Sequence, residues 1–408
     1  MNRVLIIGIP IGVVAAVGLV WFLFFRAPGV EVVPVTTEPE LQSDFTQTVN
    51  VDSPENTGDA IAATEPGEGE AVSISVDSKI YKIGNGPVAG ATIIQTLRPT
   101  TTVARYVQQN NGHVFDITLD SSGAVPRSIS NTTIPGIVRV LWAAGGNAAL
   151  LQYLDAGVTK TVHLGFPVGQ STTTRPVTIK FLPDGIQDLA VSPSGASVVY
   201  LLKTATGVNG FIAKADGTES KQVFTIPLKE VLISWPSQGT LLAQSKSAFG
   251  VPGIAFSINA TSGAVLPLLY ASGLTLTANP SFARVVYQTN GTTYSREVAT
   301  GKSLELSFDP YPEKCIWGTA TTTYLYCATP LDYTDAAYLN TWHQGINPTS
   351  DAILLFDVAT DQETILAVPG SEEGGVDSAI HSMSISEDNN YLLFVRRGDY
   401  SLWGVRTN

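Results

Sequence analysis

Residues 190–203, AVSPSGASVVYLLK, contain two apolar runs separated by a short Ser-Pro-Ser-Gly segment. The runs are rich in Val, Leu and Tyr, which favour strands, and Ser, Pro and Gly favour a tight turn, so the stretch predicts a β-hairpin. Looser copies of this hairpin recur along the chain. The repetition, more than any single motif, therefore determines the architecture.

The repeats can be followed through the central residue of the second apolar run in each hairpin. These residues are Tyr106, Leu150, Val199, Leu242, Val286, Leu325 and Leu393, at successive spacings of 44, 49, 43, 44, 39 and 68 residues. A first run and a turn precede most of them, and two further runs follow most of them. Four short strands in a period of roughly 40–45 residues are typical of a β-propeller blade. The sequence therefore predicts an all-β, seven-bladed β-propeller over residues 71–408, with six or eight blades as the alternatives.

The segment VSPSGASVVYLLKTATGVNGFIAKADG, residues 191–217, resembles the TolB-type, WD-like propeller repeat. That repeat carries Ser-Pro-Asp-Gly, then a strand, then a second strand that ends in Asp-Gly. Ser194 stands where the family usually has Asp, and the other blades of this chain match the pattern more loosely. The resemblance implies the propeller fold, and a fold does not by itself imply an activity.

The last blade has three strand candidates, in SMSISED, YLLFVRRGD and YSLWGVRTN, over residues 382–408. A ring closes only if the exposed edge of its last sheet is paired. The stretch AVSISVDSKIYKI, residues 71–83, is a further strand candidate, and we expect it to add the missing outer strand.

Residues 4–25, VLIIGIPIGVVAAVGLVWFLFF, contain no charged side chain. A helix of this length extends roughly 33 Å, enough to cross the hydrocarbon core of a bilayer. A cleaved secretory signal is the alternative, but the run leads into FFRAPGV, which lacks a small-x-small cleavage site. We therefore expect residues 1–3 to form a short cytoplasmic end and residues 4–25 an uncleaved transmembrane signal anchor. The chain after the anchor would be extracytoplasmic, in a single-pass protein of the cell membrane.

Residues 27–70 contain 10 of the 35 Asp and Glu residues and no Lys or Arg. This acidic stretch, with its scattered Pro, Thr and Gly, predicts a disordered linker. Residues 71–408 hold 21 Lys and Arg against 25 Asp and Glu, so the predicted propeller is nearly neutral. No basic stripe interleaved with aromatics is present, which argues against a nucleic-acid partner.

Cys315 and Cys327 flank the sequence IWGTATTTYLY, two apolar runs about a turn-like segment. If the runs pair antiparallel, the two cysteines lie nearly opposite each other, and a disulfide can form. Two buried free thiols are the alternative. A disulfide agrees with export, and no spacing typical of a zinc site or other metal centre is present.

The spacing of 68 arises from an insertion, residues 328–351, between the second and third strands of the sixth blade. Aromatic and acidic side chains gather there, as they do at recognition surfaces, and Tyr311 in the preceding interblade connection adds to them. The alternative is a decorative loop whose aromatics pack on the propeller. The candidate ligand- or partner-binding residues are Asp332, Tyr333, Asp335, Tyr338, Trp342, His343 and Tyr311.

Catalytic motifs are missing from the sequence: there is no GxSxG, HExxH, P-loop or GxGxxG, and the four histidines lie in different repeats. We therefore name no catalytic residue, cofactor or metal. The sequence favours a membrane-anchored, extracytoplasmic propeller that binds another envelope protein or a surface ligand as a non-catalytic scaffold. The alternative is a propeller-type hydrolase or lyase acting on cell-surface glycans.

Overall fold

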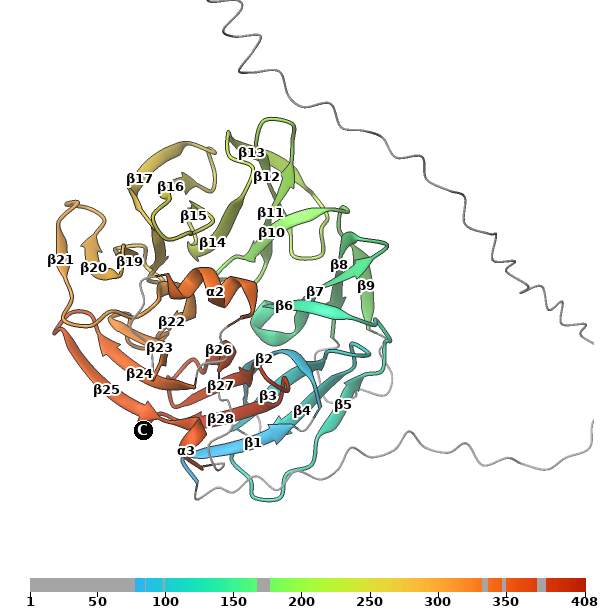
Figure 1. Cartoon of the computed structure of the whole chain (residues 1–408). Helices are drawn as coiled ribbons and strands as arrows, with labels where there is room; N and C mark the ends of the chain where they lie inside the picture. Colours follow the sequence, from blue (N-terminus) through green and yellow to red (C-terminus); the bar gives the residue numbers. More distant parts are fainter. Residues whose placement is uncertain are drawn as a thin grey trace, which may run out of the picture. The chain divides into compact units, whose positions relative to one another are not determined.

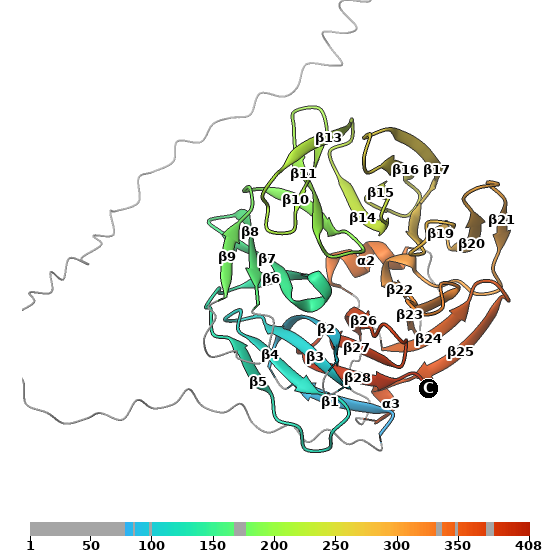
Figure 2. The same cartoon turned by 180° about the vertical axis from the view of Figure 1, so that it is seen from behind.

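The computed structural model describes residues 78–84, 86–97, 100–166, 177–331, 337–346, 350–372 and 379–408. These residues form seven four-stranded antiparallel sheets arranged as a ring, with the first strand of each blade near the centre (Figures 1 and 2). The prediction of an all-β seven-bladed propeller is confirmed. The predicted anchor at 4–25 and the linker at 27–70 lie outside the described residues, and no helix within those residues is long and apolar enough to cross a membrane.

The strands of the first four blades, from the inside outward, are β2 (Val88–Leu97), β3 (Thr100–Gln108), β4 (Val114–Thr118) and β5 (Arg127–Ser130); β6 (Ile137–Ala143), β7 (Ala148–Asp155), β8 (Val158–Gly165) and β9 (Thr178–Phe181); β10 (Ile186–Val191), β11 (Ser197–Lys203), β12 (Val208–Lys214) and β13 (Lys221–Ile226); and β14 (Val231–Ser237), β15 (Thr240–Ser245), β16 (Pro252–Asn259) and β17 (Val265–Ser272).

The strands of the last three blades are β18 (Thr275–Ala278), β19 (Arg284–Thr289), β20 (Thr292–Glu297) and β21 (Ser303–Glu305); β22 (Cys315–Trp317), β23 (Tyr324–Pro330), β24 (Asp351–Asp357) and β25 (Gln362–Ala367); and β26 (Ile380–Ile385), β27 (Tyr391–Arg396), β28 (Leu402–Arg406) and β1 (Ile80–Gly84). The short helices are η1 (Ala144–Gly146), η2 (Pro312–Lys314), α2 (Tyr338–Gln344) and α3 (Pro369–Glu372).

The ring closes through the N-terminal strand, as the sequence predicts. β1 pairs antiparallel with β28, and Ile80 lies opposite Val405. β1 is thus the outer strand of a blade whose other three strands come from the end of the chain. The predicted closing segment began at residue 71, and its part before residue 78 lies outside the described residues.

The hairpin of residues 190–203 forms by antiparallel pairing of β10 with β11. Ser192 holds the turn because its hydroxyl accepts a hydrogen bond from the backbone N–H of Ser197, at 3.1 Å. In their own blades, the side-chain oxygens of Asn279 and Ser386 likewise accept the backbone N–H of the residue five positions later. Gly195 has φ of 70°, and a Cβ there would lie 2.2 Å from the backbone nitrogen of Ala144 in the neighbouring blade. The turn thus requires glycine for both its conformation and its packing.

The core is divided among the seven junctions between neighbouring blades. Each junction has its own cluster of buried apolar side chains, including the one that joins the last blade to the first. A sheet with neighbours on both faces must be apolar on both faces, and this explains the nearly continuous apolar runs of the second strands. Burying this surface is the main favourable contribution to the stability of the ring.

Candidate functional site

The insertion of the sixth blade carries α2 toward the middle of the ring (Figure 1). Asn340 of α2 accepts a hydrogen bond from the backbone N–H of Phe249, in the β15–β16 loop of the fourth blade, at 3.0 Å. On the seventh blade, Arg397 donates to the carbonyl oxygen of Trp342 at 3.1 Å. One short helix therefore links three blades.

We call the side of the ring that carries α2 the α2 face. In an antiparallel blade, the loop between the second and third strands and the connection to the next blade lie on the same side. The loop at Phe249, the connection that carries η2 and the loop at Arg397 belong to this side, and all three contact α2. Gly345 ends the helix in the left-handed conformation, with φ of 75°, and donates to the Trp342 carbonyl.

The described aromatic residues that the sequence proposed for this site lie together. The ring centroids of Tyr311 and Tyr338 are 4.8 Å apart, and those of Tyr338 and Trp342 are 6.2 Å apart. Tyr311 and Tyr338 are buried, and Trp342 packs against them partly buried. These two tyrosines therefore hold α2 on the ring and present little surface to a partner. Asp332, Tyr333 and Asp335 lie outside the described residues.

A buried ion pair lies beneath the helix. The Nζ of Lys314 lies 2.7 and 2.8 Å from the two carboxylate oxygens of Asp351 and donates to the hydroxyl of Tyr338 at 3.0 Å. The two charged side chains are 1% and 0% exposed, respectively. Burial lowers the pKa of Lys314, and the Asp351 carboxylate opposes this shift. Asp351 also accepts the backbone N–H of Ile380, which ties the sixth blade to the seventh.

Two cations lie close to the ring of Trp342. The Nζ of Lys314 and the guanidinium carbon of Arg397 are each 4.1 Å from its centroid. Each cation–π contact of this kind stabilises the folded state by roughly 0.5–2 kcal/mol, depending on how far the cation is removed from water. Trp342 thus connects the buried ion pair to the surface around Arg397.

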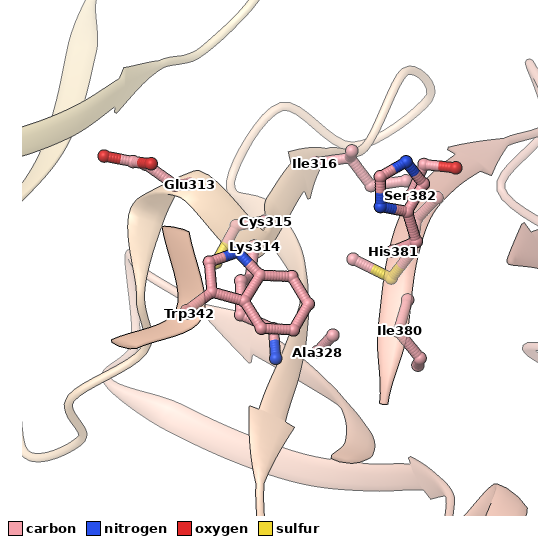
Figure 3. A pocket seen from close by; sticks show the side chains of 10 residues that line it. Glu313, Lys314, Cys315, Ile316, Ala328, Trp342, Ile380, His381 and Ser382 are labelled. Carbon is pink, nitrogen blue, oxygen red and sulfur yellow. The ribbon is translucent and has the colours of Figure 1, made fainter. Parts of the chain in front are cut away.

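A small pocket opens beside Trp342, between β22 and β26 (Figure 3). The side chains of Trp342 and Lys314 bound one side, and His381 and Ser382 of β26 bound the other. The remaining lining residues are Glu313, Cys315, Ile316, Ala328, Ile380 and Met383. The pocket therefore lies between the inner strands of the sixth and seventh blades.

The two ionisable groups at the rim of this pocket behave differently. Although His381 is exposed, desolvation by the surrounding wall, and secondarily the positive charge of Arg397, lowers its pKa, so its imidazole is neutral at pH 7. Glu313 lies 3.0 Å from the Nε2 of His343 and accepts a hydrogen bond from the hydroxyl of Thr275 at 3.1 Å. His343, one of the seven predicted binding residues, therefore forms a polar contact between α2 and the ring.

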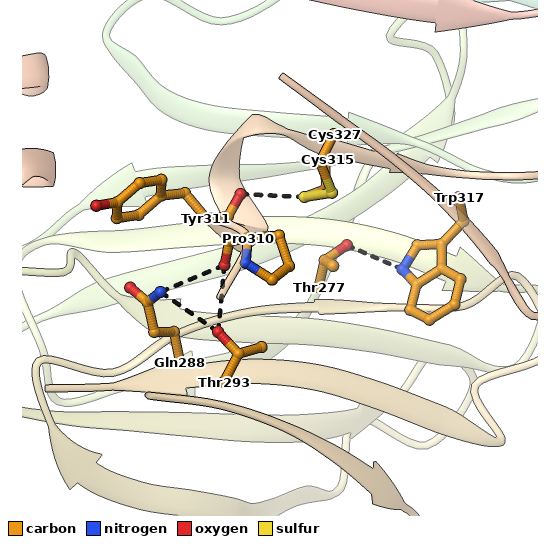
Figure 4. Close-up of a disulfide and its surroundings, with 8 residues drawn as sticks. All are labelled: Thr277, Gln288, Thr293, Pro310, Tyr311, Cys315, Trp317 and Cys327. Carbon is orange, nitrogen blue, oxygen red and sulfur yellow. Dashed lines mark hydrogen bonds between the residues drawn. A yellow bond between two sulfur atoms is a disulfide. The ribbon is translucent and has the colours of Figure 1, made fainter. Parts of the chain in front are cut away.

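Cys315 and Cys327 form a disulfide, with their Cα atoms 4.1 Å apart and opposite each other in the pairing of β22 with β23 (Figure 4). The connection just before Cys315 is fixed as well, because Gln288 donates to the carbonyl of Pro310 at 3.3 Å. Just after it, the indole of Trp317 donates to Thr277 at 3.2 Å. These contacts hold Lys314 and Cys315 in place beside the pocket.

Sequence reasoning missed Lys314, Asp351, Arg397 and His381. Lys314 adjoins the predicted cysteine and Asp351 ends the predicted insertion, so the position of each was a weak signal. Arg397 and His381 carried none, because they reach the site only when the last blade is docked. The described residues contain no group of three or more His, Cys, Asp or Glu placed to hold a metal ion.

The comparisons with known proteins bear on the fold. No protein-family model matches the chain, and no curated protein matches it. Among solved structures, an oligogalacturonate lyase in complex with manganese is similar, with a TM-score of 0.55 and 10% identity over 84% of this chain and 95% of the other. TolB from Acinetobacter baumannii is similar with a TM-score of 0.41 and 11% identity, over 69% of this chain and 64% of the other. At such low identity the likeness to the lyase concerns the fold alone, and the weaker one to TolB adds no argument.

Proposed function

We propose that the chain is a membrane-anchored, extracytoplasmic propeller that binds another envelope protein or a surface ligand on its α2 face, without catalysis. The observation that carries the proposal is α2 itself, which is attached to three blades and so presents a surface fixed in advance. A rigid surface loses little conformational entropy when a partner binds. Residues 4–25, as an anchor, would keep this surface at the membrane.

Exposed apolar side chains support a docking role. Phe249 and Val251 project from the β15–β16 loop, and Leu331 and Ile346 flank α2 on either side in the sequence. All four lie in loops of the α2 face, which also carries the exposed polar residues His343 and Gln344. A surface that mixes apolar and polar groups in this way is typical of a protein-binding site.

The charged groups at the site favour binding over acid–base chemistry. Lys314 and Asp351 neutralise each other in the interior, and Glu313 is engaged by His343 and Thr275. A general acid or base must reach a substrate in a defined protonation state, and a sealed ion pair cannot do so.

The proposal can be tested by affinity capture with the full chain, solubilised from its membrane. The substitutions Phe249→Ser and Ile346→Ser should remove the captured partner, since they take apolar surface from the α2 face. Ile365→Ser is the matched control, because Ile365 on the outer strand β25 is 63% exposed and Ile346 is 61% exposed. If all three variants capture the same partner as the wild type, the α2 face is not the docking surface.

A further inference from the structure

Arg397 is a cation on the α2 face for which the described residues show no acidic partner. Near it, Lys314 pairs with Asp351 and Arg396 with Asp399, and the imidazole of His343 contacts Glu313. The side chain of Arg397 instead donates to the carbonyl of Trp342 and stacks on its ring. Its charge therefore remains available to a ligand.

The guanidinium of Arg397 is held in position. Its backbone N–H donates to the carbonyl of Ala379 at 2.7 Å, and its guanidinium carbon lies 4.1 Å from the centroid of Trp342. The Trp342 carbonyl takes one of the five N–H donors of the side chain, so a fork of donors remains. A stacked, oriented arginine of this kind suits two-point binding of a carboxylate.

Apolar surface lies next to this charge. A Cβ built on Gly345 would lie 3.3 Å from a terminal nitrogen of Arg397, so the end of α2 is in direct contact with the guanidinium. Ile346, the next residue, is exposed and is fixed by a hydrogen bond from its N–H to the Thr341 carbonyl. At Asn340 the same helix is bound to the loop that carries the exposed Phe249. A ligand seated here meets the Arg397 guanidinium with apolar side chains beside it.

We propose that Arg397 is the subsite for a carboxylate of an acidic peptide segment, whose neighbouring apolar side chains pack on Ile346 and Phe249. This inference rests on the proposed docking function of the α2 face. A guanidinium fixed beside apolar groups complements an Asp or Glu within an apolar segment. It does not complement a nucleic acid or an anionic membrane, which would need many cations on one surface.

Random 12-residue peptides displayed on phage and selected on the full chain provide the test. Peptides selected on the wild type should be enriched in Asp or Glu beside large apolar residues. Arg397→Gln should weaken the binding of a selected peptide roughly 10- to 150-fold, the range for a lost hydrogen bond to a charged group. Arg397→Lys, which keeps the charge and loses the fork, should give an intermediate loss. Arg127→Gln is the control for a lost surface cation, since Arg127 is 65% exposed on the outer strand β5.

The decisive measurement is a double-mutant cycle with the selected peptide in which Glu is replaced by Gln. If Arg397 contacts that carboxylate, the peptide change should weaken binding to the wild type and have little effect on Arg397→Gln. Equal weakening of both proteins overturns the inference, as does selection of peptides without acidic residues or of no peptides at all. Each of these results leaves the docking function to be judged separately by the Phe249 and Ile346 capture experiment.

Discussion

Replacing Lys314 with Met should lower the free energy of unfolding by about 3–5 kcal/mol, the cost of leaving one charge of a buried pair uncompensated. The magnitude follows from the burial of both side chains, which are 1% and 0% exposed. The methionine can fill most of the space, so the loss measures the stranded carboxylate of Asp351. The exposed pair of Lys203 with Glu230, 55% and 59% exposed, is the matched control, and Lys203→Met should cost at most about 1 kcal/mol.

The partner substitution separates charge from packing. Asp351→Asn keeps an oxygen that can accept the N–H of Ile380 and removes the negative charge. The double variant Lys314→Met, Asp351→Asn should therefore be more stable than Lys314→Met alone, by at least about 2 kcal/mol, because no charge is left buried.

Urea unfolding of the full chain, followed by both tryptophan fluorescence and circular dichroism, measures these differences. Coincident transitions by the two probes would justify a single free energy of unfolding for each variant. A loss for Lys314→Met no larger than that of Lys203→Met would refute the reasoning, since the pair would then behave as if it were in water. A double variant as unstable as the sum of the two single variants would refute it as well.

Three further changes test other parts of the fold. Replacing Cys315 and Cys327 with Ser should lower the free energy of unfolding by about 3 kcal/mol, measured as a lower urea midpoint. A reductant should shift the midpoint of the wild type in the same way. In the same assay, Gly404→Val should lower the free energy of unfolding by about 1–3 kcal/mol, because a Cβ there would lie 2.6 Å from the ring of Tyr81 on β1. Gly398→Val is the control and should cost little, because Gly398 has open space around it. Burial lowers the pKa of His163 below 6.5, so the unfolded chain binds the proton first and stability should fall as the pH drops below that value. His163→Phe should flatten this part of the pH profile, and an unchanged slope would exclude His163 as its source.

The repeat in the sequence was sufficient to predict the ring because a blade is a local structure. Each hairpin, such as that of residues 190–203, forms between neighbours in the chain, and its turn residues and apolar strands are visible together. The opposing positions of Cys315 and Cys327 follow from the same local pairing. The long-range pairing of β1 with β28 could also be expected, since an unpaired edge strand must be covered.

The proposed binding surface depended on the tertiary structure. The sequence predicted a binding role for the insertion and its aromatic residues, but Tyr311 and Tyr338 turn inward and anchor α2. Lys314 and Arg397 lie 83 positions apart in the chain, yet both approach the ring of Trp342. Which charges are paired is fixed only when separate blades meet around the axis of the ring. Coulomb interactions depend on distance in space and on burial, and no local pattern of residues encodes either.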